Sequence, residues 1–123
     1  NAFTYSVWND NDPFNKYEAV FPQLMAQHTD LFDEEESISL AREAYTKTMR
    51  VALHHRYKVP FSYTLEMSYG GMNKGSRRKT QFSQGGYREI GQASVSALAE
   101  MMIDYVPIDR MTRNYEPPVK DPL

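Results

Sequence analysis

The residues that most often carry catalysis or bind metals are few in this chain and stand apart. Its three histidines are His28, His54 and His55, and none has a His-x-x-Glu or His-x-x-x-His spacing. Zinc sites use such spacings because two ligands must project from one face of a helix. His54 and His55 are adjacent, so on a helix they would point about 100° apart and would not easily bind one ion. We therefore find no recognisable zinc site and expect His54 and His55 to lie at the surface.

One acidic residue stands in an unusual place. Glu66 lies within residues 61–69, where large apolar or aromatic side chains alternate with small polar ones. A carboxylate in such a strand costs free energy unless it faces water, pairs with a cation or accepts protons. From the pattern alone, the ordinary interpretation is a solvent-facing strand residue. The chain also lacks Gly-x-Ser-x-Gly, phosphate-loop and Gly-x-Gly-x-x-Gly motifs, so the common serine-hydrolase and nucleotide-binding classes have no support.

Composition narrows the class of protein further. The 123 residues are 41% hydrophobic and 24% charged, which fits one globular domain or a piece of one. A formal net charge of −2 gives no general attraction for nucleic acid or anionic lipid. No apolar run approaches the roughly 18–20 residues that cross a bilayer, and no signal-peptide pattern opens the chain. Because cysteine is absent, we expect a cytoplasmic protein, and because the first residue is Asn1, one that begins inside a longer product or after processing.

The elements that would position Glu66 follow from hydrophobic periodicity. A period of two predicts strands at residues 3–8 and 61–69, and residues 37–40 are a candidate for a short third strand. Steps of three and four predict helices at residues 17–27, 46–57 and 87–105. The third helix is the clearest, and its stripe consists of Tyr87, Ile90, Ser94, Ala97, Leu98, Met101 and Tyr105. We assign residues 1–106 to one domain piece and residues 107–123 to a proline-rich tail that cannot hold a helix.

Two runs of like charge have an ordinary interpretation as solvated surface. Nothing at metal-ligand spacing accompanies Asp33–Glu36, so we expect a solvated loop there. Arg77–Lys79 lies within residues 72–86, which are rich in Gly, Ser and Gln and predict an exposed loop. These three cations could attract an acidic partner such as a glutamate-rich tail, but such runs more often serve solubility. Both alternatives stay open for the basic run.

The sequence around Glu66 is similar to that of a known family. Residues 63–71, YTLEMSYGG, resemble the strand that carries the general-base glutamate of the metallocarboxypeptidases (zinc carboxypeptidases), in particular of their cytosolic branch. Further resemblances extend over roughly residues 1–105, and they involve Asn1–Tyr5, Phe21–Met25, Asp30–Phe32, Thr48–Val51 and Tyr87–Gly91. Thr48–Val51 resembles the branch's Thr-x-Arg-Val motif, and only this motif and the Glu66 strand are specific.

The resemblance implies roles for three residues. In this family a zinc ion, held by a His-x-x-Glu pair and a later histidine, polarises the scissile carbonyl and acidifies a water. Glu66 would take that water's proton and pass it to the leaving amine. Arg50 would lie at the base of the pocket for the C-terminal side chain, where a guanidinium favours a carboxylate, and Lys47 would add charge there. The alternative for Arg50 is a helix-surface residue whose stem packs on the sheet.

The resemblance also implies a fold and a function. The fold would be α/β, the C-terminal part of a three-layer α/β/α carboxypeptidase-like domain with a mixed sheet. Its zinc ligands would lie upstream of Asn1, and we expect the sheet edge and apolar surface to pack against that missing N-terminal portion or a partner chain. The function would be removal of C-terminal or side-chain-linked glutamates from proteins with acidic C-termini such as tubulin tails, in the cytoplasm and at the cytoskeleton or cilium. The alternative is a non-catalytic scaffold component of a larger cytoskeletal assembly.

Overall fold

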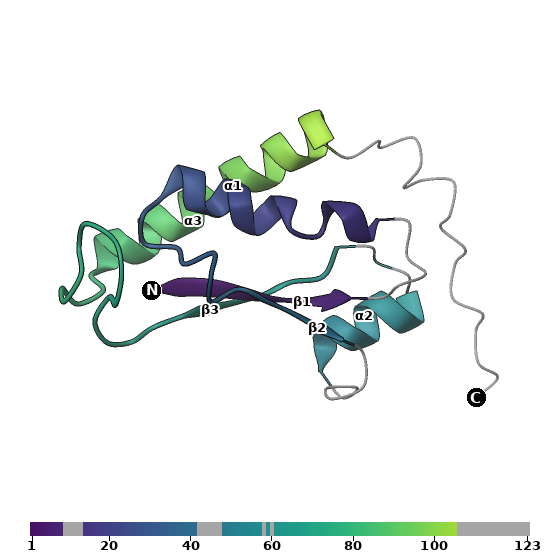
Figure 1. The fold of residues 1–123 in the computed structure, drawn as a ribbon, viewed down its shortest axis with the longest axis horizontal. Coiled ribbons are helices and arrows are strands. Elements are labelled where there is room, and N and C mark those ends of the chain that lie inside the picture. Colours follow the sequence, from purple (N-terminus) through teal and green to yellow (C-terminus); the bar gives the residue numbers. More distant parts are fainter. Residues whose placement is uncertain (9–13, 42–47, 58, 60, 106–123) are drawn as a thin grey trace.

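The computed structural model describes residues 1–8, 14–41, 48–57, 59 and 61–105. These residues form a mixed α/β structure with helices on both sides of one sheet (Figure 1). The strands are β1 (Ala2–Trp8), β2 (Ile38–Ala41) and β3 (Thr64–Met67). The helices are a 3₁₀ turn (Asn15–Tyr17), α1 (Val20–His28), α2 (Met49–Tyr57), α3 (Gln84–Glu100) and a π-helical turn (Met101–Tyr105).

The sheet is mixed, as predicted, and its strand order is β2-β1-β3. β1 runs parallel to β2, with Tyr5 opposite Ile38, and antiparallel to β3, with Phe3 opposite Glu66 and Tyr5 opposite Thr64. Because residues directly opposite each other in a pair of strands point to the same face, this register decides which side chains share a surface. β1 is thus the central strand, and β3 lies along one of its edges.

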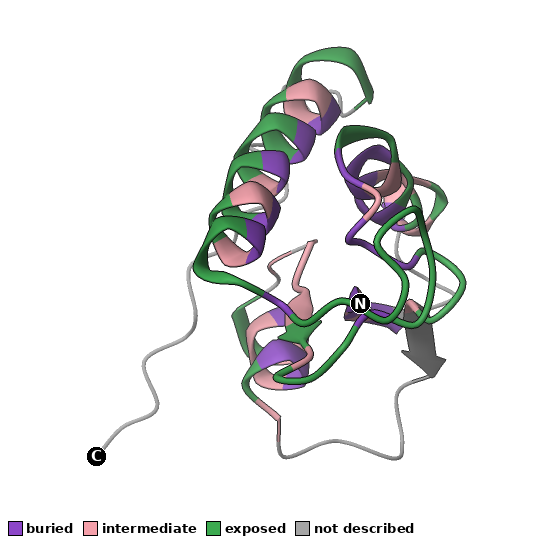
Figure 2. Ribbon diagram, turned by 90° about the vertical axis from the view of Figure 1, so that its left-hand side faces the viewer, coloured by how far each residue is buried: buried purple, intermediate pink, exposed green. Residues whose placement is uncertain are grey.

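The hydrophobic core lies between β1 and the pair of helices α1 and α3. Figure 2 shows the buried side of α3 turned toward α1. Ala2 at the start of β1 belongs to this core, and Leu65 of β3 packs against it. The buried core side chains of the helical layer and the segment after α1 are Phe21, Leu24, Met25, Leu31, Phe32, Ile90, Ala93, Ala97 and Met101. No helix within these described residues is long and apolar enough to cross a membrane.

The predicted helices are present, but their details differ. α1 begins at Val20 rather than at Tyr17, which lies in the 3₁₀ turn. α3 begins at Gln84 rather than at Tyr87, because the Ser83 hydroxyl caps its first turn by accepting a hydrogen bond from the Gly86 amide at 3.2 Å. The expected loop over residues 72–86 is therefore wrong at its C-terminal end. In the α3 stripe, Leu98 and Tyr105 are exposed, whereas Ala93 is buried in the layer shared with α1.

The strand that carries Glu66 is shorter than predicted. β3 covers Thr64–Met67 of the expected residues 61–69. Phe61 and Tyr63 leave the strand pattern to contact the core: the Phe61 ring lies 5.7 Å from that of Phe14, and the Tyr63 hydroxyl donates to the Glu18 carbonyl at 2.9 Å. Tyr69, at the other end, is 99% exposed. Core contacts thus replace strand pairing at one end, and the chain leaves the sheet at the other.

Candidate functional site

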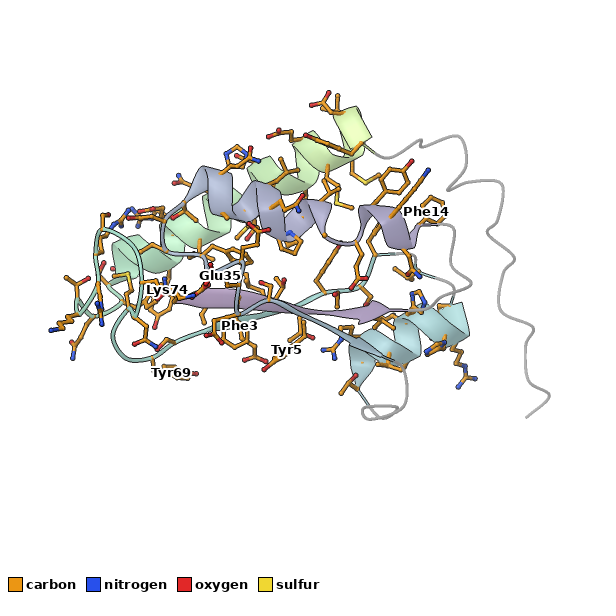
Figure 3. The ribbon with its side chains drawn as sticks, in the orientation of Figure 1. Phe3, Tyr5, Phe14, Glu35, Tyr69 and Lys74 are labelled. Atoms are coloured by element: carbon orange, nitrogen blue, oxygen red, sulfur yellow. The ribbon has the colours of Figure 1, made fainter. Side chains whose placement is uncertain are left out.

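Glu66 lies on the face of the sheet that is turned away from α1 and α3. It stands opposite Phe3 across the β1–β3 pair, and Phe3 and Tyr5 project to this face in Figure 3. The Glu66 side chain is exposed, and within the part of the chain that the structure describes no hydrogen bond or ion pair reaches its carboxylate. The ordinary expectation of a solvent-facing strand residue is therefore confirmed.

Arg50 approaches the same face from α2. Its Nη1 donates to the Thr64 hydroxyl at 2.9 Å, and its guanidinium carbon lies 5.7 Å from the centre of the Tyr5 ring. Thr64 and Glu66 are alternate residues of β3, so they point to the same side. The structure thus brings Arg50 and Glu66 to one face, with Thr64 between them.

The environment of Arg50 corrects the alternative interpretation of this residue. The side chain is only 7% exposed, so its placement at the helix surface is wrong, and it is the guanidinium that contacts Thr64 and Tyr5 of the sheet. The face of α2 that is buried consists of Arg50, Val51 and His54, while Met49 is exposed. Lys47, the second residue proposed for the pocket, lies outside the described residues.

The aromatic surroundings of Glu66 were not foreseen from the sequence. Phe3 and Tyr5 pack edge to face, with ring centres 5.4 Å apart, and Tyr69 projects on the same side just beyond β3 (Figure 3). Alternation along residues 3–8 indicates that Phe3 and Tyr5 share a face. Only the register with β3 shows that this face is the one that carries Glu66.

The histidines do not form a site. His54 is buried, and its Nδ1 lies 3.1 Å from the Val59 carbonyl oxygen, so the expected surface position of this residue is wrong. His55 is half-buried with its ring against that of His54. His28 lies at the end of α1, where its Nε2 is 3.1 Å from a carboxylate oxygen of Glu100 on α3. Each described imidazole therefore has a structural contact of its own.

The zinc ion that the resemblance implies does not fit the residues described. Among them no group of three or more His, Asp or Glu side chains is placed to hold a metal ion. Glu66 has no histidine beside it, and the imidazoles of His28 and His54 make the contacts given above. A zinc site would therefore need ligands from beyond this part of the chain.

Part of the acidic run is bound to Lys74, in the loop after β3, rather than free in solvent. Asp33 is buried, contrary to the expected solvated loop, and its carboxylate lies 3.3 Å from the ammonium group of Lys74. The same ammonium group donates a hydrogen bond of 2.6 Å to Glu35. This bond is the main reason why the pKa of Lys74 is raised, and the hydrogen bond to Asp33 raises it further. Glu34 and Glu36 are exposed as predicted.

Arg77 holds the loop after β3 against α1 and α3. Its guanidinium makes two parallel bonds of 2.8 Å to the Glu89 carboxylate and lies 3.1 Å from Asp30. These bonds from Arg77, with one from Thr29, lower the pKa of Glu89. The hydrogen bond from the Ser76 hydroxyl, with the charge of Arg77, lowers the pKa of Asp30. Arg77 is therefore a structural residue, which charge runs in the sequence alone do not reveal.

No family model matches the chain, and no curated protein shows significant similarity to it. The likeness of residues 63–71 to the carboxypeptidase strand rests on the residues themselves, and the role of Glu66 stays a hypothesis.

Proposed function

We propose that this chain supplies the proton acceptor and the substrate-pocket arginine of a zinc carboxypeptidase domain. Its substrates would be proteins with C-terminal or side-chain-linked glutamates, such as tubulin. The observation that supports this proposal most is the β1–β3 register, which puts Glu66 on the face where Arg50 contacts Thr64. Two residues that the resemblance assigns to one site thus share one surface.

Glu66 would act as the general base. Its carboxylate is exposed, so a water molecule bound next to it could give up a proton as it attacks a peptide carbonyl, and the same carboxyl could return that proton to the leaving amine. This chemistry needs a carboxylate that is not already held by a cation. Within the described residues no ion pair reaches Glu66, which meets this condition.

Arg50 would select an acidic C-terminal side chain. It bonds to Thr64, which lies two residues from Glu66, or about 7 Å along the strand. One extended glutamate residue can bridge such a separation between its side-chain carboxylate and its backbone. A guanidinium favours a carboxylate over a neutral or cationic side chain, because only the carboxylate offers an opposite charge and two hydrogen-bond acceptors.

Two parts of the domain would come from outside the described residues. One is the zinc site, for which these residues offer no ligand set. The other is a cover for exposed apolar side chains on α3 and the π-helical turn, of which Val95 is 70% and Ile103 77% exposed. This surface also favours the alternative, in which the chain is a scaffold component without catalysis, because an uncovered apolar face is typical of an interaction site.

The two functions are separated by an assay of the intact protein that contains this chain. Three peptides that differ only in the last residue, Glu, Ala or Lys, would be incubated with the zinc-loaded protein, and release of that residue would be measured. We expect release of glutamate, little release of alanine or lysine, and loss of activity after chelation of the metal. If no residue is released from any peptide, the enzymatic proposal is contradicted and the scaffold alternative gains support.

A further inference from the structure

The loop between β3 and α3 is a hydrogen-bonded hairpin rather than a loose connection. The Met72 amide donates to the Thr80 carbonyl at 2.9 Å, and the Lys79 amide donates back to Met72 at 2.8 Å. A further bridge pairs Gly71 with Gln81. These bonds fix the backbone between the two ends of the loop.

Contacts with the rest of the molecule hold this hairpin in place. Arg77 is bound to Glu89 and Asp30, and Lys74 to Asp33 and Glu35. The side-chain oxygen of Asn1 accepts hydrogen bonds from two loop amides, those of Asn73 at 2.7 Å and Lys74 at 3.0 Å. Gly75 lies so close to the segment after α1 that an added Cβ would come within 2.8 Å of the Asp30 carbonyl oxygen.

The loop carries four cations, Lys74, Arg77, Arg78 and Lys79, and the last two are available to bind a ligand. Arg78 and Lys79 are exposed, and among the described residues neither has an ion-pair partner. Lys79 has a φ of 68°, in the left-handed region that non-glycine residues seldom adopt, and its backbone bond to Met72 holds it there. A fixed turn thus presents two adjacent cations to solvent.

We propose that Arg78 and Lys79 bind an acidic peptide segment. This inference rests on the proposed function: the acidic segment would be the part of the substrate that precedes the cleaved residue. The hairpin follows β3 in the chain (Figure 1), so it begins at the end of the strand that carries Glu66. We take a polypeptide rather than a nucleic acid as the ligand, because the substrates of the proposed function are proteins with acidic C-termini, whose carboxylates complement these two cations.

Because their geometry is fixed, these cations should bind a ligand more tightly than the same charges in a mobile loop would. A guanidinium can bind a carboxylate through two parallel bonds, and an ammonium can bind the next one. Because the turn is already ordered by its backbone bonds, little conformational entropy is lost when a ligand binds.

The test is binding of a fluorescent hexaglutamate peptide with an amidated C-terminus, measured by anisotropy at low ionic strength with the intact protein. The double variant Arg78→Gln/Lys79→Gln should bind about three- to tenfold more weakly. The matched control Lys16→Gln/Arg88→Gln removes the same charge from exposed residues elsewhere and should bind like the wild type. Equal losses in both variants, or no binding by the wild type, would overturn the proposal.

Two further arms define the ligand and separate this inference from the proposed function. A single-stranded oligonucleotide of equal charge should bind more weakly than the peptide, and tighter binding would show a nucleic-acid site instead. The amidated peptide has no free C-terminal carboxylate, so its binding does not depend on catalysis, and Glu66→Gln should leave it unchanged. If the wild-type protein releases glutamate but does not bind the amidated peptide, only this inference is overturned. If it binds the peptide but releases no glutamate, only the proposed function is overturned.

Discussion

Thr64 links the two side chains on which the proposed chemistry depends. It accepts a hydrogen bond from Arg50 and shares a strand face with Glu66. The sequence predicts the polar side of this strand correctly, because a period of two separates Glu66 from the apolar positions. It does not predict the direction of Arg50, since the buried face of α2 is chosen by specific partners, Thr64 for Arg50 and the Val59 carbonyl for His54.

The bond between Arg50 and Thr64 should contribute measurably to stability. We expect Thr64→Val to lower the free energy of unfolding by about 1–2 kcal/mol, because it removes the acceptor from a buried charged donor without changing the side-chain shape. Thr64→Ser, which keeps the hydroxyl, is the matched control and should cost less, despite the weaker strand preference of serine. Urea denaturation of the two variants checks this, and a valine variant at least as stable as the serine variant would contradict it.

At the scale of elements, the hairpin after β3 shows what a charge pattern cannot decide. The sequence left open whether Arg77–Lys79 recruits an acidic partner or only aids solubility. The structure divides the run, because Arg77 is bound to Glu89 and Asp30 while Arg78 and Lys79 stay exposed. These partners come from α3 and the segment after α1, so no local spacing in the sequence could reveal them.

The contacts of Arg77 should make stability depend on pH. The pKa values of Glu89 and Asp30 lie below their ordinary values of 4.5 and 3.8. The two carboxylates therefore contribute fully to the free energy of unfolding at a pH above their ordinary pKa values. This contribution is lost as the pH falls through their lower pKa values in the folded state. We expect the free energy of unfolding of the wild type to fall more steeply in this acid range than that of Arg77→Gln.

Arg78→Gln is the control for this pH dependence. It removes the same charge from the neighbouring residue, which has no ion pair among the described residues, and should keep the wild-type slope. Thermal or urea unfolding at a series of pH values measures both variants. Parallel curves for the wild type and Arg77→Gln would show that the guanidinium does not hold these carboxylates.

At the scale of the whole molecule, local pattern predicts the elements but not their assembly. The strands and helices follow from periodicity, whereas the order β2-β1-β3 depends on pairing between segments far apart in the sequence. That order decides that Phe3, Tyr5, Thr64 and Glu66 share one surface. The proline-rich tail of residues 107–123 lies outside the described residues, and its separation from the domain piece stays a prediction.

Exposed apolar side chains support the expectation that the domain continues beyond this chain or packs against a partner. Val95, Leu98, Ile103 and Tyr105 leave an apolar surface on α3 and the π-helical turn. What covers it stays a prediction, as does the cytoplasmic location.

The proposed function depends on Glu66 acting as the general base of a zinc carboxypeptidase. The most direct measurement is the turnover number for glutamate release by the intact protein, together with its zinc content, for the wild type and Glu66→Gln. Because the carboxylate is exposed and free of ion pairs within the described residues, the variant should fold and keep its zinc, while turnover falls at least about a hundredfold. Undiminished turnover in a folded, zinc-loaded Glu66→Gln protein would contradict the claim.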